Sequence, residues 1–169
     1  MRRQGFTAIE LLAAVAIAAT LAALGAPAMG QLLRRTQVDA DTGAIIAQLR
    51  TAREWALREK ADVVVCGVDR AGQCSRHDPH RFITFADANG NRRLESDETV
   101  LSSLELAFPG QIQVNLGLGS PAIHYSKGGR NNFIGNIRLC NDDGTVAAHL
   151  IVYYSARIYR QRALNQVCR

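Results

Sequence analysis

The sequence predicts an α+β protein in which one long N-terminal α-helix packs on a mainly antiparallel β-sheet head. Three observations support this fold class: an uncharged apolar run near the start, a helical spacing of apolar residues after it, and short strand-like runs from residue 61 onward. The 169 residues suffice for one domain of ordinary size with an appendage. We expect a leader over 1–5, an apolar helix over 6–30, a stem helix over 31–60 and a head over 61–169.

The apolar helix is predicted from the absence of charge. From Leu11 to Met29 no residue is charged, and only Thr20, Gly25 and Pro27 interrupt the apolar run. A hydrocarbon core about 30 Å thick needs about 20 such residues. The segment is therefore long enough to span a membrane.

The stem helix is predicted from a change to an amphipathic pattern. Apolar or small residues recur at intervals of three and four, which places them on one helix face, while most charged residues lie elsewhere. This face comprises Val38, Thr42, Ile45, Leu49, Ala52 and Ala56. We expect it to pack on the head.

The head is predicted from runs of β-branched and aromatic residues that Gly, Asn, Asp and Pro separate. The expected strands are 62–68, 81–86, 99–106, 111–116, 123–126, 134–140 and 145–159. We find no internal repeat and no second domain in the sequence.

The four cysteines are Cys66, Cys74, Cys140 and Cys168. An even number beyond a membrane segment indicates two disulfides in an oxidising compartment, and four cysteines allow three pairings. We favour Cys66–Cys74, which closes a short loop, and Cys140–Cys168, which ties down the C-terminus. A zinc site is the alternative, although the sequence has no C-x-x-C pair.

The first ten residues place a carboxylate, Glu10, beside the apolar run. Basic residues Arg2 and Arg3 followed by an apolar segment also describe a secretory signal peptide, with cleavage after Ala28. A carboxylate inside a membrane costs about 2.5–3.5 kcal/mol on insertion scales, so such residues usually have a function. Glu10 therefore argues against a simple signal peptide.

The motif Gly5-Phe6-Thr7-x-x-Glu10 resembles the class III signal of type IV pilins and pseudopilins. The resemblance implies that a prepilin peptidase cuts after Gly5 and that Phe6 becomes the N-methylated terminus. Glu10 would then neutralise the Phe6 amine, because two opposite charges in a low dielectric are each costly alone and tolerable as a pair. It also implies a bacterial inner-membrane protein with a single span, a periplasmic head, and other pilins as partners in a periplasmic or surface filament.

Three features of the head resemble the FimT/GspH family of minor pilins and type II secretion pseudopilins. They are the Cys66…Cys74 hairpin, the run Phe85–Asn91, and Ile123-x-Tyr125-x-x-x-Gly129 followed by Ile137-x-Leu139-Cys140. The resemblance implies a pilin-like fold and a structural subunit of a type IV filament machine. Two functions stay open: type IV pilus biogenesis with DNA uptake for competence, and a GspH-type pseudopilin of the type II secretion system.

Arginines gather at the C-terminus of a chain whose net charge is +5, and 155–169 contains no acid. Some FimT members bind DNA through a Gly-Arg-x-Arg motif, and Tyr159-Arg160-Gln161-Arg162 is similar, with Tyr159 in place of the glycine. The resemblance implies phosphate contacts from Arg157, Arg160 and Arg162. Tyr159 would add base stacking on single strands. The alternative is a solvated edge or a contact to another pilin.

A second motif, Asp87-x-Asn89-x-Asn91 with Glu98 at the twelfth position, resembles an EF-hand loop, whose side-chain oxygens suit calcium. Arg92 stands where glycine is expected and the flanks read as strands, so a polar hairpin turn is favoured over a secreted calcium-binding domain.

The remaining sequence predicts neither a cofactor nor a catalytic site. His77, Asp78 and His80 lie close together, but Pro79 and neighbouring arginines indicate a surface loop rather than a metal site. No Ser/His/Asp arrangement or Gly-rich phosphate loop stands out in the sequence. We therefore expect a structural and interaction protein rather than an enzyme.

Overall fold

The structure is a computed structural model that describes residues 7–77, 79, 81–108, 110–116, 120–131, 134–161 and 166–168. The chain divides into two compact units, Met1–Thr36 and Gln37–Arg169. Helix α1 runs from Ala8 to Glu59 and contributes to both units. Eight strands follow it in the second unit.

The first unit contains the apolar half of α1. The helix begins with a capping box, in which the Glu10 carboxylate accepts hydrogen bonds from the Thr7 N–H and hydroxyl, both at 2.9 Å. Its large apolar side chains are exposed, with Ile9 and Leu24 each 76% accessible. By length and composition α1 is able to cross a membrane.

In the second unit α1 packs through one stripe. The face that the helical spacing predicts is buried, and it comprises Val38, Thr42, Ile45, Leu49, Ala52 and Ala56. The polar residues Asp41 and Gln48 of the helix are buried as well. The helix ends where Lys60 takes a left-handed backbone conformation, with φ 54°. This stripe is the helix's share of the main hydrophobic core.

The first sheet has the strand order β3-β2-β1-β5, and every neighbouring pair is antiparallel. Its strands are β1 (Val63–Val68), β2 (Arg81–Ala86), β3 (Val100–Glu105) and β5 (Ala122–Tyr125). β1 is buried along its whole length, because α1 covers one of its faces and residues of two loops, Cys74 and Leu94, pack on the other.

The second sheet has the order β4-β6-β7-β8 and is also antiparallel throughout. Its strands are β4 (Gln111–Leu116), β6 (Gly135–Cys140), β7 (Val146–Val152) and β8 (Ile158–Gln161). β8 is an edge strand, and three of its four residues are exposed.

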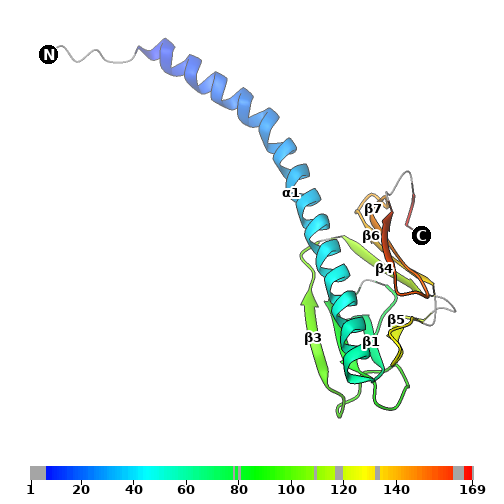
Figure 1. The fold of residues 1–169 in the computed structure, drawn as a ribbon. Helices are drawn as coiled ribbons and strands as arrows, with labels where there is room; N and C mark the ends of the chain where they lie inside the picture. Colours follow the sequence, from blue (N-terminus) through cyan, green and yellow to red (C-terminus); the bar gives the residue numbers. More distant parts are fainter. Residues whose placement is uncertain are drawn as a thin grey trace. The chain divides into compact units, whose positions relative to one another are not determined.

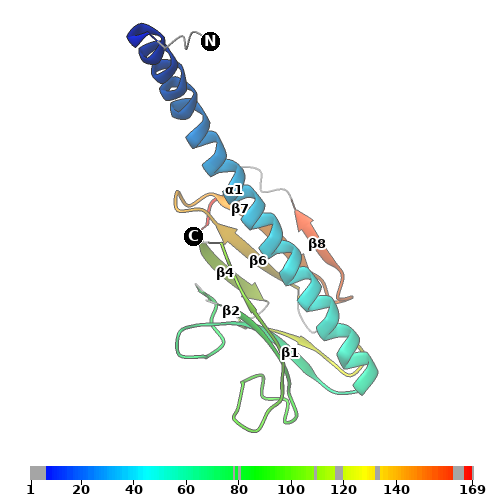
Figure 2. The ribbon, with the colours of Figure 1, turned by 90° about the vertical axis from the view of Figure 1, so that its left-hand side faces the viewer.

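The core lies where α1 meets both sheets, which Figures 1 and 2 show from two sides. Side chains from both sheets join the helix stripe there, among them Val65, Phe82, Ile137 and Leu150. A smaller cluster lies on the other face of the first sheet. It includes Val64, Ile83 and Phe85, and Cys74 and Leu94 pack against it.

Two disulfides close loops in the second unit. Cys66 is bonded to Cys74, and Cys140 to Cys168, with Cα–Cα distances of 5.5 and 6.2 Å. These are the pairings favoured from the sequence. All four cysteines are therefore in disulfides, and the zinc alternative is wrong.

The prediction of one continuous strand over residues 145–159 is wrong. The run 145–159 is two strands, β7 and β8, separated by a tight turn. In that turn the Ala156 N–H donates to the Tyr153 oxygen at 2.8 Å, and Ala156 has φ 57°. The chain therefore reverses within Tyr153–Arg157 although neither glycine nor proline marks the place.

Candidate functional site

The processing motif is only partly described. Gly5 and Phe6 lie outside the described residues, so the expected cleavage and methylation sites stay predictions. Glu10 is described at the start of α1, where its carboxylate is bonded to Thr7. A carboxylate at a helix N-terminus also complements the positive end of the helix dipole.

The two described arginines of the predicted basic tail, Arg157 and Arg160, lie in different surroundings. Arg157 lies exposed in the turn before β8, and Arg162 lies outside the described residues. Arg160 stands opposite Leu150 in the β7–β8 ladder, on the face of the sheet that meets α1. Its guanidinium donates a hydrogen bond to the carboxylate of Asp39 on the helix and forms an ion pair with it. Arg160 is therefore engaged within the molecule.

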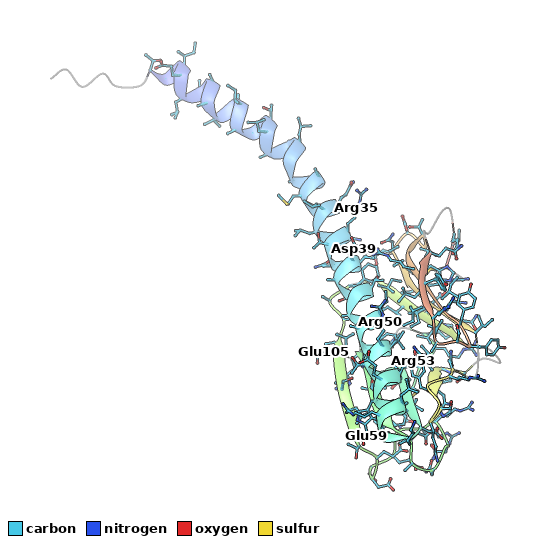
Figure 3. The ribbon with its side chains drawn as sticks, viewed as in Figure 1. Arg35, Asp39, Arg50, Arg53, Glu59 and Glu105 are labelled. Carbon is cyan, nitrogen blue, oxygen red and sulfur yellow. A yellow bond between two sulfur atoms is a disulfide. The ribbon has the colours of Figure 1, made fainter. Side chains whose placement is uncertain are left out.

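A groove of about 470 Å³ lies between α1 and the turn that leads into β8. The helix contributes Arg50, Arg53, Glu54 and Leu57, and the turn and strand contribute Ala156, Arg157, Ile158 and Tyr159. Figure 3 shows Arg50 and Arg53 on the second half of the helix. Three guanidinium groups thus line the groove together with one carboxylate, so its charge favours an anion.

The arginines of the groove differ in how they are held. Nε of Arg53 donates to the main-chain oxygen of Gly129 at 3.0 Å, which fixes this side chain against the turn after β5. Within the described part of the chain, the guanidinium groups of Arg50 and Arg157 have no hydrogen-bond or ion-pair partner. Their guanidinium groups are available to a ligand.

Aromatic rings lie beside these arginines. The rings of Tyr153 and Tyr159 pack edge to face, with centroids 5.4 Å apart, and remain 39% and 51% exposed. Tyr159 also lines the groove. Guanidinium groups bind phosphates, and exposed aromatic rings stack on unpaired bases. The combination is chemically suited to a single-stranded nucleic acid.

Sequence reasoning missed Arg50 and Arg53. Their spacing of three places both on one helix face, and that signal is visible in the sequence. The sequence does not tell which strand lies opposite that face, because the β7–β8 turn brings Arg157 to it only in the folded head.

The candidate metal ligands Asp87, Asn89, Asn91 and Glu98 all lie in the loop between β2 and β3. Across the described residues, no group of three or more His, Cys, Asp or Glu side chains is placed to hold a metal ion. In the other candidate cluster His77 is exposed, while Asp78 and His80 lie outside the described residues.

Two histidines among the described residues, His124 and His149, are buried, and both lie outside the groove. Burial lowers the pKa of His124, and the nearby Asp62 carboxylate, 3.9 Å from its Nε2, opposes that shift. Burial and the positive charge of Arg138 lower the pKa of His149. Both rings are therefore neutral at pH 7, and neither lines the groove.

Comparison with known proteins agrees with this architecture. The family model of the type II transport protein GspH matches residues 41–155. The type IV minor pilin FimU of Pseudomonas aeruginosa has a similar fold in its P21 crystal form, with a TM-score of 0.56 and 11% identity. That match covers 80% of this chain and 97% of the crystallised FimU chain. The P65 form gives a TM-score of 0.50 and 11% identity, and covers 78% and 99%. No curated protein matches the chain.

Proposed function

Since this chain belongs to the type II transport protein GspH family, we propose that it is a minor subunit of a type IV filament machine. Its fold is that of a pilin, and the family and fold are those of structural pilin subunits. The finer proposal is that the chain anchors in the bacterial inner membrane, is cut by a prepilin peptidase, and joins other pilins through α1.

One observation carries this proposal: the apolar side chains of the first half of α1 are exposed, whereas the second half is covered by the head. An apolar helix surface of that length needs lipid or neighbouring helices to cover it. A membrane before assembly and a bundle of α1 helices after assembly would each provide such a cover.

The test is the mass of the mature N-terminus when the full chain is expressed with its prepilin peptidase. We expect the loss of residues 1–5 and one added methyl group on Phe6. Gly5→Val should remain uncut, and Gly25→Val is the matched control that should still be processed. A mature chain that begins near Met29 would contradict the proposal, because it would indicate a secreted domain.

Deletion of the gene for this chain in its host would distinguish a type IV pilus from a type II secretion system. Loss of surface pili on deletion, restored by the wild-type chain, supports a role in type IV pilus biogenesis. Loss of secreted proteins with intact pili supports the GspH-type pseudopilin of type II secretion. In either case we expect Glu10→Gln to be processed but to fail in restoring function, since the Phe6 amine would lack its counter-charge.

We also propose that the head binds single-stranded DNA, because three arginines and Tyr159 line one groove and Tyr153 packs on Tyr159. In this proposal Arg157 contacts phosphate, as expected from the sequence. Arg160 forms an ion pair with Asp39, so Arg50 and Arg53 supply the other phosphate contacts. DNA capture of this kind would serve DNA uptake if the filament reaches the cell surface.

Fluorescence anisotropy of the full chain in detergent, with labelled single-stranded oligonucleotides at several salt concentrations, measures this binding. For single strands the slope of log K against log salt is about −0.7 per phosphate contact, so Arg50→Ala and Arg157→Ala should each flatten it by roughly that amount. Tyr159→Ala should weaken binding with an unchanged slope. Arg58→Ala, on the same helix but outside the groove, is the control. Equal losses in Arg58→Ala and Arg50→Ala would count against the groove.

A further inference from the structure

The ion pair between Asp39 and Arg160 lies beyond one end of the groove between α1 and β8. Asp39 precedes Arg50 by eleven residues, which is about three helical turns or about 16 Å, so the two residues lie on the same face of α1. Figure 3 shows Asp39, Arg50 and Arg53 in this order along the helix. On the strand, Arg160 directly follows Tyr159, which lines the groove. The pair therefore continues the row of charged side chains that lines the groove.

The strand β8 runs beside α1 in the opposite direction to the helix. The turn before it, at Ala156 and Arg157, shares the groove with Leu57 near the end of the helix, whereas Arg160 contacts Asp39 further back. Figure 2 shows the strand alongside the second half of the helix. All these residues belong to the second unit of the chain. A strand of nucleic acid that lies along the groove would therefore arrive at the ion pair.

The ion pair is a weak contact that β8 does not need to keep its place. Four register positions join β8 to β7, and Ile158 packs against the main core. The side chains of Arg160 and Asp39 are 45% and 61% exposed. An exposed ion pair of this kind shifts an equilibrium by at most roughly fivefold. The pair can therefore open while the fold remains intact.

The Asp39 carboxylate and a phosphate group are alternative partners of the same guanidinium group. Both present acceptor oxygens to the fork of N–H donors that arginine carries. While Asp39 holds Arg160, that guanidinium is not available to a phosphate, and the carboxylate itself repels one. The row of charges thus ends in an acid that opposes an anion, although its middle favours one.

We propose that Asp39 limits the affinity of the groove for single-stranded DNA by holding Arg160 in this ion pair. The inference rests on the DNA-binding function proposed for the groove and concerns the regulation of that site. In the wild type Arg50, Arg53 and Arg157 contact phosphates, while Arg160 stays on Asp39. Removal of the carboxylate makes Arg160 one further phosphate contact.

The expected gain follows from counterion release. One further phosphate contact on a single strand steepens the slope of log K against log salt by about 0.7, which corresponds to roughly fivefold tighter binding at about 0.1 M salt. Asp39→Ala should show both changes. Asp39→Asn should show a smaller gain, because its amide oxygen still accepts a hydrogen bond from Arg160 without the charge.

The test is fluorescence anisotropy of the full chain in detergent, with a labelled single-stranded oligonucleotide at several salt concentrations. Asp39→Ala combined with Arg160→Ala has the net charge of the wild type, and it should return affinity and slope to the wild-type values. Glu59→Ala is the matched control, because Glu59 is also an exposed carboxylate of α1 that is paired with an arginine, Arg58, but lies outside the groove. It should leave the slope unchanged.

Circular dichroism checks that each variant is folded, and Asp39→Asn preserves the test if Asp39→Ala is not. The proposal is overturned if the wild type binds and neither Asp39 variant binds more tightly. It is also overturned if the double variant keeps the gain, or if Glu59→Ala gains as much as Asp39→Ala. A failure of both the wild type and Asp39→Ala to bind the oligonucleotide would instead refute the DNA-binding function itself, and the role of Asp39 with it.

Discussion

Replacing Gly129 by alanine tests the contact between the turn after β5 and the second half of α1. Gly129 is buried and has φ +66°, and its main-chain oxygen holds Arg53. A Cβ atom there would lie 2.7 Å from Cγ of Leu57, and 2.8 and 3.0 Å from its two Cδ atoms. The substitution therefore adds two separate penalties, backbone strain and overlap with the helix.

The two penalties have different sizes. A left-handed conformation costs a non-glycine residue roughly 1–2 kcal/mol. Overpacking costs about 1–3 kcal/mol, and the lower end applies because Leu57 is 37% exposed and has room to turn aside. Gly129→Ala should therefore lower the free energy of unfolding by about 2–3 kcal/mol. Gly144→Ala should lower it by about 1–2 kcal/mol, since Gly144 has φ +78° but no atom within 4 Å of the added carbon.

The assay is thermal unfolding of the full chain in detergent, followed by the fluorescence of Trp55, which is the single tryptophan and packs against the main core. At about 4 °C per kcal/mol, Gly129→Ala should lower the melting temperature by about 8–12 °C and Gly144→Ala by about 4–8 °C. Adding Leu57→Ala to Gly129→Ala should remove the additional loss caused by overlap. Equal losses for the two glycines, together with no change on adding Leu57→Ala, would refute the reasoning.

Three further predictions concern charge and cross-links. Glu98→Gln should raise the melting temperature at pH 7 and have no effect well below pH 4.5. This follows because the folded-state pKa is raised, so stability is lost as pH rises through it. Stability should fall as the pH drops below 6.5, where the unfolded chain takes up protons that buried His149 resists, and His149→Gln should flatten that fall in melts across pH. Cys140→Ser with Cys168→Ser opens a loop with a sequence separation of 28 and should cost roughly 3–4 kcal/mol, measured by the same melts. A melting temperature of the wild type that does not change with pH would contradict the His149 prediction. A melting temperature unchanged by the two serine substitutions would contradict the disulfide prediction.

The second half of α1 could be predicted closely, because the buried face of a helix follows from the spacing of its apolar residues along the sequence. Ile45 and Leu49 are four residues apart, and both are fully buried. β1 was also readable, since its run of valines without polar alternation indicates a strand covered on both sides.

The division of the head into two sheets could not be predicted, because strand order depends on pairings between distant residues. β1, for example, lies between β2 and β5 rather than beside β4. The groove was missed for the same reason. Its helix side and its strand side are about a hundred residues apart in the sequence, and the turn at Ala156 that joins them lacks the usual glycine.

The Cys140–Cys168 disulfide makes β7, the turn and β8 part of one covalent ring. β8 is a short edge strand, and edge strands of this kind are where a chain peels away or is exchanged with another molecule. Inside a closed ring, β8 has no free end to withdraw, so pulling on the head or opening the edge leaves the strand tethered to β6. Reduction of this one bond would turn the same strand into a detachable arm.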